Sequence, residues 1–259
     1  AEVCNTFTPS SNLGGASKFS SHYYNESFFI EEFMLIISNK SKKEFRDFLD
    51  DKKFEYIETI DNPNLDIRIA DHPDLSIFIL DEENVVIDKA VVDYYKEKIS
   101  GVNFISGENV EAKYPRDSIY NIYMGSDYFI HNDQTEKNIL QFMNKNIYKH
   151  YFTRQGYSRC SVVPMGDKIL TSDYGIYKTL KDKIEVVLLS EENIPLDGFD
   201  NGFLGGTCGF FENTLIFNGN IEKLNSYETI KMEAKKSGIK LLYPNNCDLF
   251  DTGSLIFVK

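Results

Sequence analysis

Residues 155–176, QGYSRCSVVPMGDKILTSDYGI, contain two short apolar runs that predict strands at 158–163 and 168–170. The glycine-containing segment between the runs predicts a tight turn, because glycine adopts backbone conformations that other residues avoid. Asp173 follows the second run and can cap a helix. A further apolar run at 184–189 predicts a closing strand. The stretch therefore predicts one strand–strand–helix–strand unit.

The same order of elements recurs along the chain. The second strands of the units centre on apolar residues that lie about 40–50 residues apart, namely Leu35, Val86, Phe129, Ile169 and Ile216. A period of this size is typical of propellers and other repeat arrays. We therefore predict four complete units and the parts of a fifth.

The two ends of the chain supply the fifth unit. Residues 251–258 predict a strand with no partner after it, and residues 28–37 predict a strand with no partner before it. If these strands pair, the ring closes and leaves no free sheet edge. We therefore predict an α/β fold: a five-bladed β/α propeller of ββαβ repeats, closed by the N- and C-terminal strands. An ordinary α/β sheet built of similar βαβ units is the alternative.

Composition and charge limit the classes of partner. The chain has 259 residues, of which 42% are hydrophobic and 26% charged, enough for a buried core. Its net charge of −12 argues against nucleic acid and anionic membranes, because both would be repelled. No apolar run reaches the roughly 20 residues of a membrane-spanning helix. We expect a polar N-terminal arm at 1–27 and a single domain at 28–259.

Cysteine and glycine spacing argues against a bound metal or nucleotide. The four cysteines, at positions 4, 160, 208 and 247, lie far apart and have no metal-binding spacing. Such sparse cysteines favour the reducing cytoplasm over a disulfide framework. The pair Gly205 and Gly206 lacks the spacing of a phosphate-binding loop. We therefore expect no metal and no cofactor.

Several short motifs carry a family resemblance. They are His72-Pro73-Asp74, His131-Asn132, Gln155-Gly156-Tyr157, Cys160-Ser161, Thr171-Ser172-Asp173, Gly175-Ile176, residues 202–206, and Asp251 with Gly253-Ser254. Together they resemble a family of uncharacterised bacterial proteins with the pentein fold, the fold of the guanidino-group-modifying enzymes. That fold is a ring of five ββαβ units. The resemblance implies a deiminase, a dimethylarginine hydrolase or an amidinotransferase, or a role without catalysis, since one pentein is a non-enzymatic initiation factor.

Polar residues gather where the first strands of the units begin. In a five-bladed ring these strands line a central channel, and their candidate residues are Asp74, Asn121, Cys160 with Ser161, Thr207 with Cys208, and Asp251 with Ser254. His72 lies two residues before Asp74 and so on the same side of a strand. One polar group from each blade predicts a central pocket for a small ligand, and the resemblance implies that this ligand is a cationic guanidino or amidino compound. Alternatively, these groups cap strand ends and bond to one another or to water.

The resemblance also implies a catalytic set. Pentein enzymes use a nucleophilic cysteine near the chain end, a histidine as acid and base, and carboxylates that hold the guanidinium. The last nine residues here, DTGSLIFVK, contain no cysteine. The candidate nucleophile is therefore Cys160, with His72 as acid and base. Asp74 and Asp251 are the candidate ligand anchors.

The sequence leaves two functions open. One is a guanidino or amidino hydrolase or transferase that acts through a cysteine, with Cys208 and His131 as alternative catalytic residues. The other is a non-catalytic binding or scaffold module, because cysteines are more often buried than reactive. A thiol that reacts rapidly in the native protein would favour the first function. The sequence gives no indication of oligomeric state.

Overall fold

The computed structural model of the chain describes residues 33–259. In chain order its elements are β1 (Met34–Ile37), α1 (Lys43–Asp51), β2 (Tyr56–Glu58), a 3₁₀-helix (Pro73–Leu75), β3 (Ile77–Ile79), β4 (Asn84–Asp88), α2 (Val92–Lys98), β5 (Asn103–Gly107), β6 (Tyr123–Met124), β7 (Tyr128–His131), α3 (Lys137–Lys145), β8 (Lys149–Phe152), β9 (Val163–Met165), β10 (Lys168–Thr171), α4 (Tyr174–Leu180), β11 (Val186–Leu188), a second 3₁₀-helix (Leu204–Thr207), β12 (Cys208–Phe211), β13 (Thr214–Phe217), α5 (Tyr227–Ser237), β14 (Lys240–Leu242) and β15 (Ile256–Val258). The predicted arm at 1–27 and the start of the strand predicted at 28–37 lie outside the described residues. Within 33–259, no helix has the length and apolar character needed to cross a membrane.

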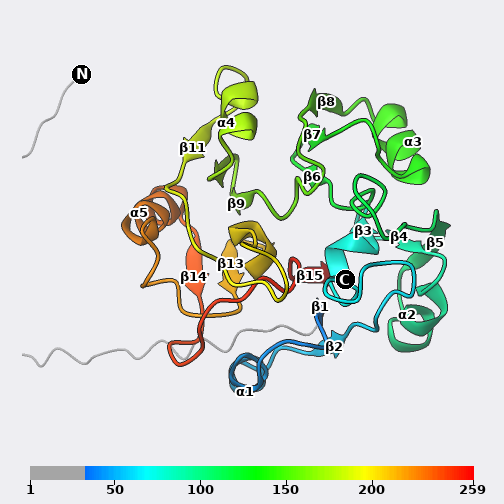
Figure 1. Ribbon diagram of the computed structural model, residues 1–259, viewed down its shortest axis with the longest axis horizontal. Helices are drawn as coiled ribbons and strands as arrows, with labels where there is room; N and C mark the ends of the chain where they lie inside the picture. The colour runs from blue at the N-terminus through cyan, green and yellow to red at the C-terminus, as the bar shows by residue number, and fades with distance from the viewer. Residues whose placement is uncertain (1–32) are drawn as a thin grey trace, which may run out of the picture.

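The strands of residues 33–259 form five separate three-stranded sheets, and each sheet is one blade of a ring. Four blades use consecutive strands: β3-β4-β5, β6-β7-β8, β9-β10-β11 and β12-β13-β14. In each of them the first strand runs antiparallel to the middle strand and the third runs parallel to it. Figure 1 shows the blades around a common centre, with the helices on the outer rim. The predicted ring of ββαβ units is confirmed.

The remaining blade joins the two ends of the described chain. In it, β1 pairs antiparallel with β15, with Ile36 opposite Ile256, and parallel with β2. The C-terminal strand therefore occupies the place that a hairpin partner of β1 would otherwise fill. An ordinary continuous sheet is ruled out, because no hydrogen-bonded strand pair of the described chain links one blade to the next.

The middle strands carry much of the core. The residues predicted at their centres, Leu35, Val86, Phe129, Ile169 and Ile216, are each at most 1% exposed. A middle strand has neighbours on both edges, and side chains from adjacent blades or helices cover its faces. Burial of each such side chain stabilises the fold by about 1.5–3 kcal/mol.

The inner strands, which are the first strands of the blades, are shorter than the sequence predicts. By the same repeat pattern, the sequence predicts first strands at 74–80, 118–124, 158–163, 207–211 and 251–258. They are observed at 77–79, 123–124, 163–165, 208–211 and 256–258. The preceding residues turn instead of extending. Pro73 starts a 3₁₀-helix because it has no N–H for a sheet, and Gly253 has φ of +73°, outside the strand region. Most candidate site residues therefore lie on turns at the channel mouth.

Removal of residues 256–259 should open the ring. The truncation deletes β15 and exposes the antiparallel edge of β1, along with apolar surface that Val258, itself 1% exposed, covers. We expect the free energy of unfolding, measured by urea denaturation, to fall by about 3 kcal/mol or more. Deletion of Lys259 alone is the control, because an exposed ion pair such as Lys259–Glu82 contributes about 0–1 kcal/mol. Equal unfolding midpoints for the two truncations would contradict the closure.

Candidate functional site

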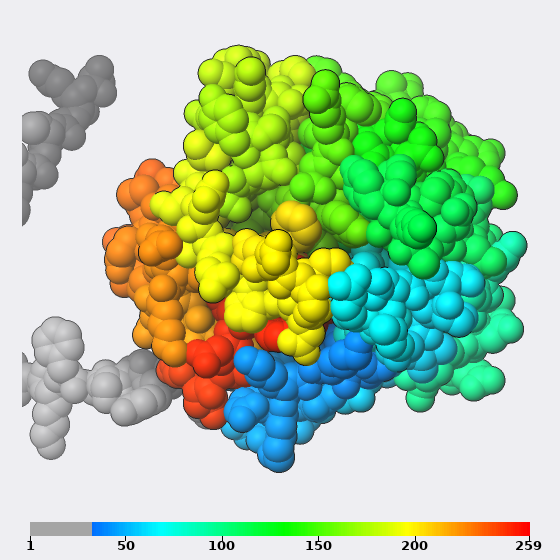
Figure 2. Space-filling model, in the orientation of Figure 1, coloured from blue at the N-terminus to red at the C-terminus, as the bar shows by residue number. Residues whose placement is uncertain are grey.

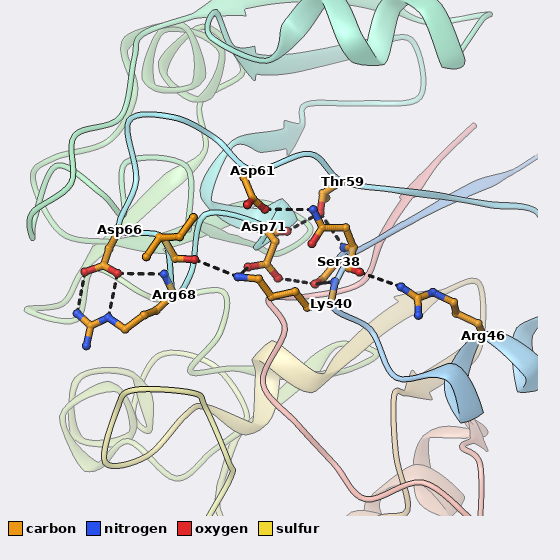
Figure 3. A network of polar contacts seen from close by, with 10 residues as sticks. Ser38, Lys40, Arg46, Thr59, Asp61, Asp66, Arg68 and Asp71 are labelled. Atoms are coloured by element: carbon orange, nitrogen blue, oxygen red, sulfur yellow. Dashed lines mark hydrogen bonds and ion pairs between the residues drawn. The ribbon is translucent and has the colours of Figure 1, made fainter.

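A polar network fixes the segment that leads into Asp74 (Figure 3). The carboxylate of Asp71 is buried and accepts hydrogen bonds from the Ser38 hydroxyl and from Lys40 Nζ, the latter at 2.6 Å. The backbone oxygen of Asp71 accepts a bond from Thr59 Oγ1 at 2.7 Å. Ser38 directly follows β1, and Thr59 directly follows β2. The closing blade therefore holds this segment in place.

Asp74 lies in the first 3₁₀-helix and is 2% exposed. Its Oδ2 accepts a hydrogen bond from the Cys160 thiol, with Sγ at 2.9 Å, and one from the Ser254 backbone N–H at 2.8 Å. Its Oδ1 is also buried but has no hydrogen-bond partner in the described chain. The segments before β3, β9 and β15 thus meet at one carboxylate, which keeps one oxygen free.

Asn121 and Cys160 bind each other reciprocally. The backbone N–H of Cys160 donates to Asn121 Oδ1 at 3.1 Å, and Asn121 Nδ2 donates to Cys160 Sγ at 3.1 Å. Both residues are buried. The thiol is therefore held between an amide donor and the Asp74 carboxylate.

Asp251 anchors the segment that crosses the centre of the ring. Its Oδ2 accepts the Phe203 backbone N–H at 2.7 Å, and its Oδ1 accepts that of Gly253 at 3.1 Å. A Cβ atom on Gly206 would lie 2.1 Å from Asp251 Oδ1, so only glycine allows this close approach. In Figure 2 the segment near residue 200, drawn in yellow, lies across the centre of the face shown. Asp251 is itself 1% exposed.

The remaining candidates bond to nearby carbonyl groups. Thr207 Oγ1 donates to the Leu204 oxygen at 2.7 Å. Ser254 Oγ and Cys208 Sγ both donate to the Gly205 oxygen, at 3.2 and 3.5 Å. These contacts are of the kind expected if the groups cap strand ends and support the turns.

The two histidine candidates have different surroundings. His72 is buried against Gly253, since a Cβ atom there would lie 2.8 Å from His72 Cβ, and its ring forms no hydrogen bond within residues 33–259. His131 is fully buried, with Nε2 2.9 Å from the Gly156 oxygen and Nδ1 2.9 Å from Thr135 Oγ1. Burial lowers the pKa of His131 to about 4. Its ring is therefore neutral near pH 7 and serves the structure.

Burial raises the pKa of both central thiols. The pKa of Cys160 lies well above its ordinary range, because the thiol is desolvated and the negative charges of Asp74 and Asp251 oppose a thiolate. Burial raises the pKa of Cys208 to about 11. Both cysteines are therefore thiols at neutral pH. Burial also raises the pKa of the Asp251 carboxyl, against the opposing effect of nearby His72.

A cavity of about 370 Å³ lies in the channel, and every inner strand contributes to its walls. The walls are mostly apolar and include Phe78, Tyr123, Pro164, Phe210 and Phe257, from β3, β6, β9, β12 and β15. The charged residues that line it within the described chain are Asp74 and Arg159. We call this space the channel cavity. Of the site residues predicted from the sequence, Asp74 alone lines it.

Sequence reasoning missed Arg159. Its guanidinium donates to the backbone oxygens of Val162, Gly205 and Cys208, at 3.3, 3.4 and 3.1 Å. Arg159 is the only charged residue between positions 155 and 166, and it directly precedes Cys160. A lone charge in an apolar, channel-forming stretch is the signal that identifies it.

Ser161 directly follows Cys160 in the sequence, but its surroundings are different. It lines a second cavity, of about 320 Å³, between the β9–β10 hairpin and residues 189–204. Asp173 also lines this cavity, and its Oδ1 accepts the Ile176 N–H at 2.9 Å, which confirms the predicted helix cap. No group of three or more His, Cys, Asp or Glu residues within 33–259 is placed to hold a metal ion.

Comparison with known proteins identifies a family and a fold. A family model described as "Family of unknown function (DUF6873)" matches residues 36–256. No curated protein sequence is significantly similar to the chain. Among solved structures, dimethylarginine dimethylaminohydrolase (DDAH) in an adduct with 4-chloro-2-hydroxymethylpyridine is 9% identical over 82% of this chain and 92% of its own, with a TM-score of 0.50. A variant of DDAH from Pseudomonas aeruginosa, in complex with citrulline, is 8% identical over 82% of this chain and 91% of its own, also at 0.50. The fold is the pentein fold.

The Cys160 thiol should resist alkylation in the native protein. Only the thiolate attacks iodoacetamide, and the raised pKa leaves little thiolate at neutral pH. Labelling of the Cys160 peptide, followed by mass spectrometry, should be much slower in the native protein than in the urea-unfolded chain. Rapid, selective labelling of native Cys160 would contradict this environment.

Asp251 should destabilise the protein as the pH rises. The raised folded-state pKa means that the folded protein keeps a proton that the unfolded chain has released. This stabilising contribution is present below the ordinary aspartate pKa of about 4 and is lost as the pH rises through the folded-state value. As the pH rises from about 4 to about 7, the free energy of unfolding of the wild type, measured by urea denaturation, should therefore fall relative to that of Asp251→Asn. A difference in unfolding free energy that stays constant over this range is the contrary result.

Proposed function

Since the chain belongs to the family of unknown function DUF6873 and has the pentein fold, we propose that its channel cavity binds a small molecule with a guanidino or amidino head group. The observation that carries this proposal is Oδ1 of Asp74. This oxygen is buried without a partner, and Asp74 lines the cavity. The head group donates to Asp74.

A cationic head group suits the surroundings of Asp74. The carboxylate accepts bonds from a thiol and a backbone N–H but forms no ion pair with a residue in 33–259. A buried carboxylate without a cationic partner is costly, because desolvation is only partly offset. A planar guanidinium or amidinium supplies charge and several N–H donors in one plane, which is the geometry that carboxylates bind best.

The remaining walls define the rest of the ligand. The cavity volume of about 370 Å³ falls within the range of small-molecule sites. Its aromatic and aliphatic walls favour an apolar body attached to the head group. Arg159 has five N–H donors, of which the three backbone carbonyls use only part. We expect an acceptor group on the ligand to lie against Arg159, away from the cationic head.

Binding without turnover is the function we favour. Hydrolysis or amidino transfer through Cys160 needs a thiolate, which attacks the amidine carbon. The buried thiol instead donates to Asp74, and its pKa is raised. The last nine residues, where the resemblance implies a nucleophile, contain no cysteine. The described thiols Cys160, Cys208 and Cys247 are unpaired, and we place the protein in the reducing cytoplasm.

Asp74→Asn should abolish most of the affinity for methylguanidinium, measured by isothermal titration calorimetry. A hydrogen bond to a charged group contributes about 1.5–3 kcal/mol, so affinity should fall by about 10- to 100-fold. Methylurea, a neutral analogue of similar shape, should bind the wild type weakly.

Asp88→Asn is the matched control. Asp88 is also fully buried, and it accepts the backbone N–H groups of Ala90 and Val110, but it does not line the channel cavity. We expect this variant to keep wild-type affinity once circular dichroism shows that it is folded. The proposal fails if Asp74→Asn binds methylguanidinium as tightly as wild type, or if both variants lose affinity equally. Release of ammonia or methylamine by the wild type, lost in Cys160→Ser, would show that the channel is catalytic.

A further inference from the structure

The second cavity, defined above by Ser161 and residues 189–204, has an acidic lining. Asp173, Glu191 and Glu192 all line it, and no Lys, Arg or His of the described chain does. None of the three carboxylates forms an ion pair with a residue in 33–259; Asp173 and Glu192 accept bonds from backbone N–H groups and an amide. The negative charge of this space is therefore not neutralised by the protein itself.

The Ser161 hydroxyl gives independent evidence for a ligand, because it lacks a hydrogen-bond partner within residues 33–259. Its side chain is 7% exposed, and its hydroxyl has no hydrogen-bond partner in the described chain. Its backbone oxygen is already occupied, because Thr171 Oγ1 donates to it at 2.7 Å. A buried hydroxyl is nearly always hydrogen-bonded in a native protein. A ligand in the cavity that Ser161 lines would supply that bond.

The second cavity also has an apolar part of its lining. Val163, Leu189, Ile194 and Leu204 line it and belong to one hydrophobic cluster of the core. The cavity thus offers a ligand both carboxylates and hydroxyls and aliphatic surface. Its volume, about 320 Å³, suits a small organic molecule.

We propose that this second cavity binds a small primary alkylamine through its ammonium group. The ammonium donates to the Ser161 hydroxyl and to the carboxylates, and the alkyl chain packs against the apolar lining residues. This inference does not rest on the proposed function of the channel cavity.

The hydrogen bonds already present favour an ammonium over a guanidinium. Both oxygens of Glu192 accept backbone N–H groups, from Ser226 at 2.7 Å and Asn225 at 3.0 Å. Both oxygens of Asp173 are likewise engaged, by Ile176 N and Gln155 Nε2. Neither of these two carboxylates therefore has two unoccupied oxygens for a planar fork, but each oxygen keeps one lone pair for a single further donor. An ammonium is a compact charge whose three donors reach separate acceptors.

Titration of butylammonium chloride into the full chain, followed by calorimetry, tests this site. Ser161→Ala and Glu191→Gln should each weaken binding by about 2- to 10-fold, the range for loss of one hydrogen bond. Neither change should impair folding, because the Ser161 hydroxyl has no partner and Glu191 is exposed. Glu97→Gln, at an exposed position outside the cavity, is the control and should bind as wild type does.

Two further binding measurements distinguish this site from the channel cavity. Asp74→Asn should keep wild-type affinity for butylammonium, and butanol should bind far more weakly than butylammonium. The proposal is overturned if butylammonium shows no saturable binding at millimolar concentration, if butanol binds equally well, or if Ser161→Ala and Glu191→Gln leave its affinity unchanged. Loss of butylammonium binding in Asp74→Asn alone would also overturn it, because the amine would then occupy the channel cavity.

Discussion

The Asp74 carboxylate is the contact on which the centre of the ring depends. Through one oxygen it holds the Cys160 thiol and the Ser254 backbone, so that segments distant in sequence meet at the channel mouth. The same contact contributes to the chemistry of Cys160, whose pKa is raised first of all by burial. A thiol that donates to a buried carboxylate is stabilised in its protonated form, and nearby Asp251 strengthens this effect. The Asp74 contact therefore contributes both to structural cohesion and, together with burial, to low thiol reactivity.

Close packing above the channel explains why the polar residues there differ in role. Glycines at positions 202, 206 and 253 let the backbone approach Asp251, Asp74 and His72 within distances that any Cβ would obstruct. Most of the central polar groups are thereby buried against backbone partners. Asp74 alone among the predicted residues both lies in this layer and lines the channel cavity. The centre is consequently a closely packed layer in which Asp74 borders the channel cavity.

Much of the fold could be predicted from the sequence, because the middle strands are apolar, regularly spaced and separated by turns and caps. Leu35 and Ile169, chosen as strand centres from that pattern, are fully buried. The inner strands were predicted too long, since apolar residues in the turns before β6 and β9 resemble strand residues. The site was harder to predict. Adjacent Cys160 and Ser161 have different surroundings, since Cys160 bonds to Asp74 and Ser161 lines the second cavity, and this depends on backbone turns that the pattern does not encode. The free oxygen of Asp74 likewise follows from tertiary contacts alone.

A crystal structure of the protein soaked with methylguanidinium chloride would test the central claim most directly. The account predicts planar density in the channel cavity, with a nitrogen within hydrogen-bonding distance of Asp74 Oδ1 and no covalent bond to Cys160 Sγ. Density elsewhere with the channel cavity unoccupied, or a covalent adduct on Cys160, would contradict it.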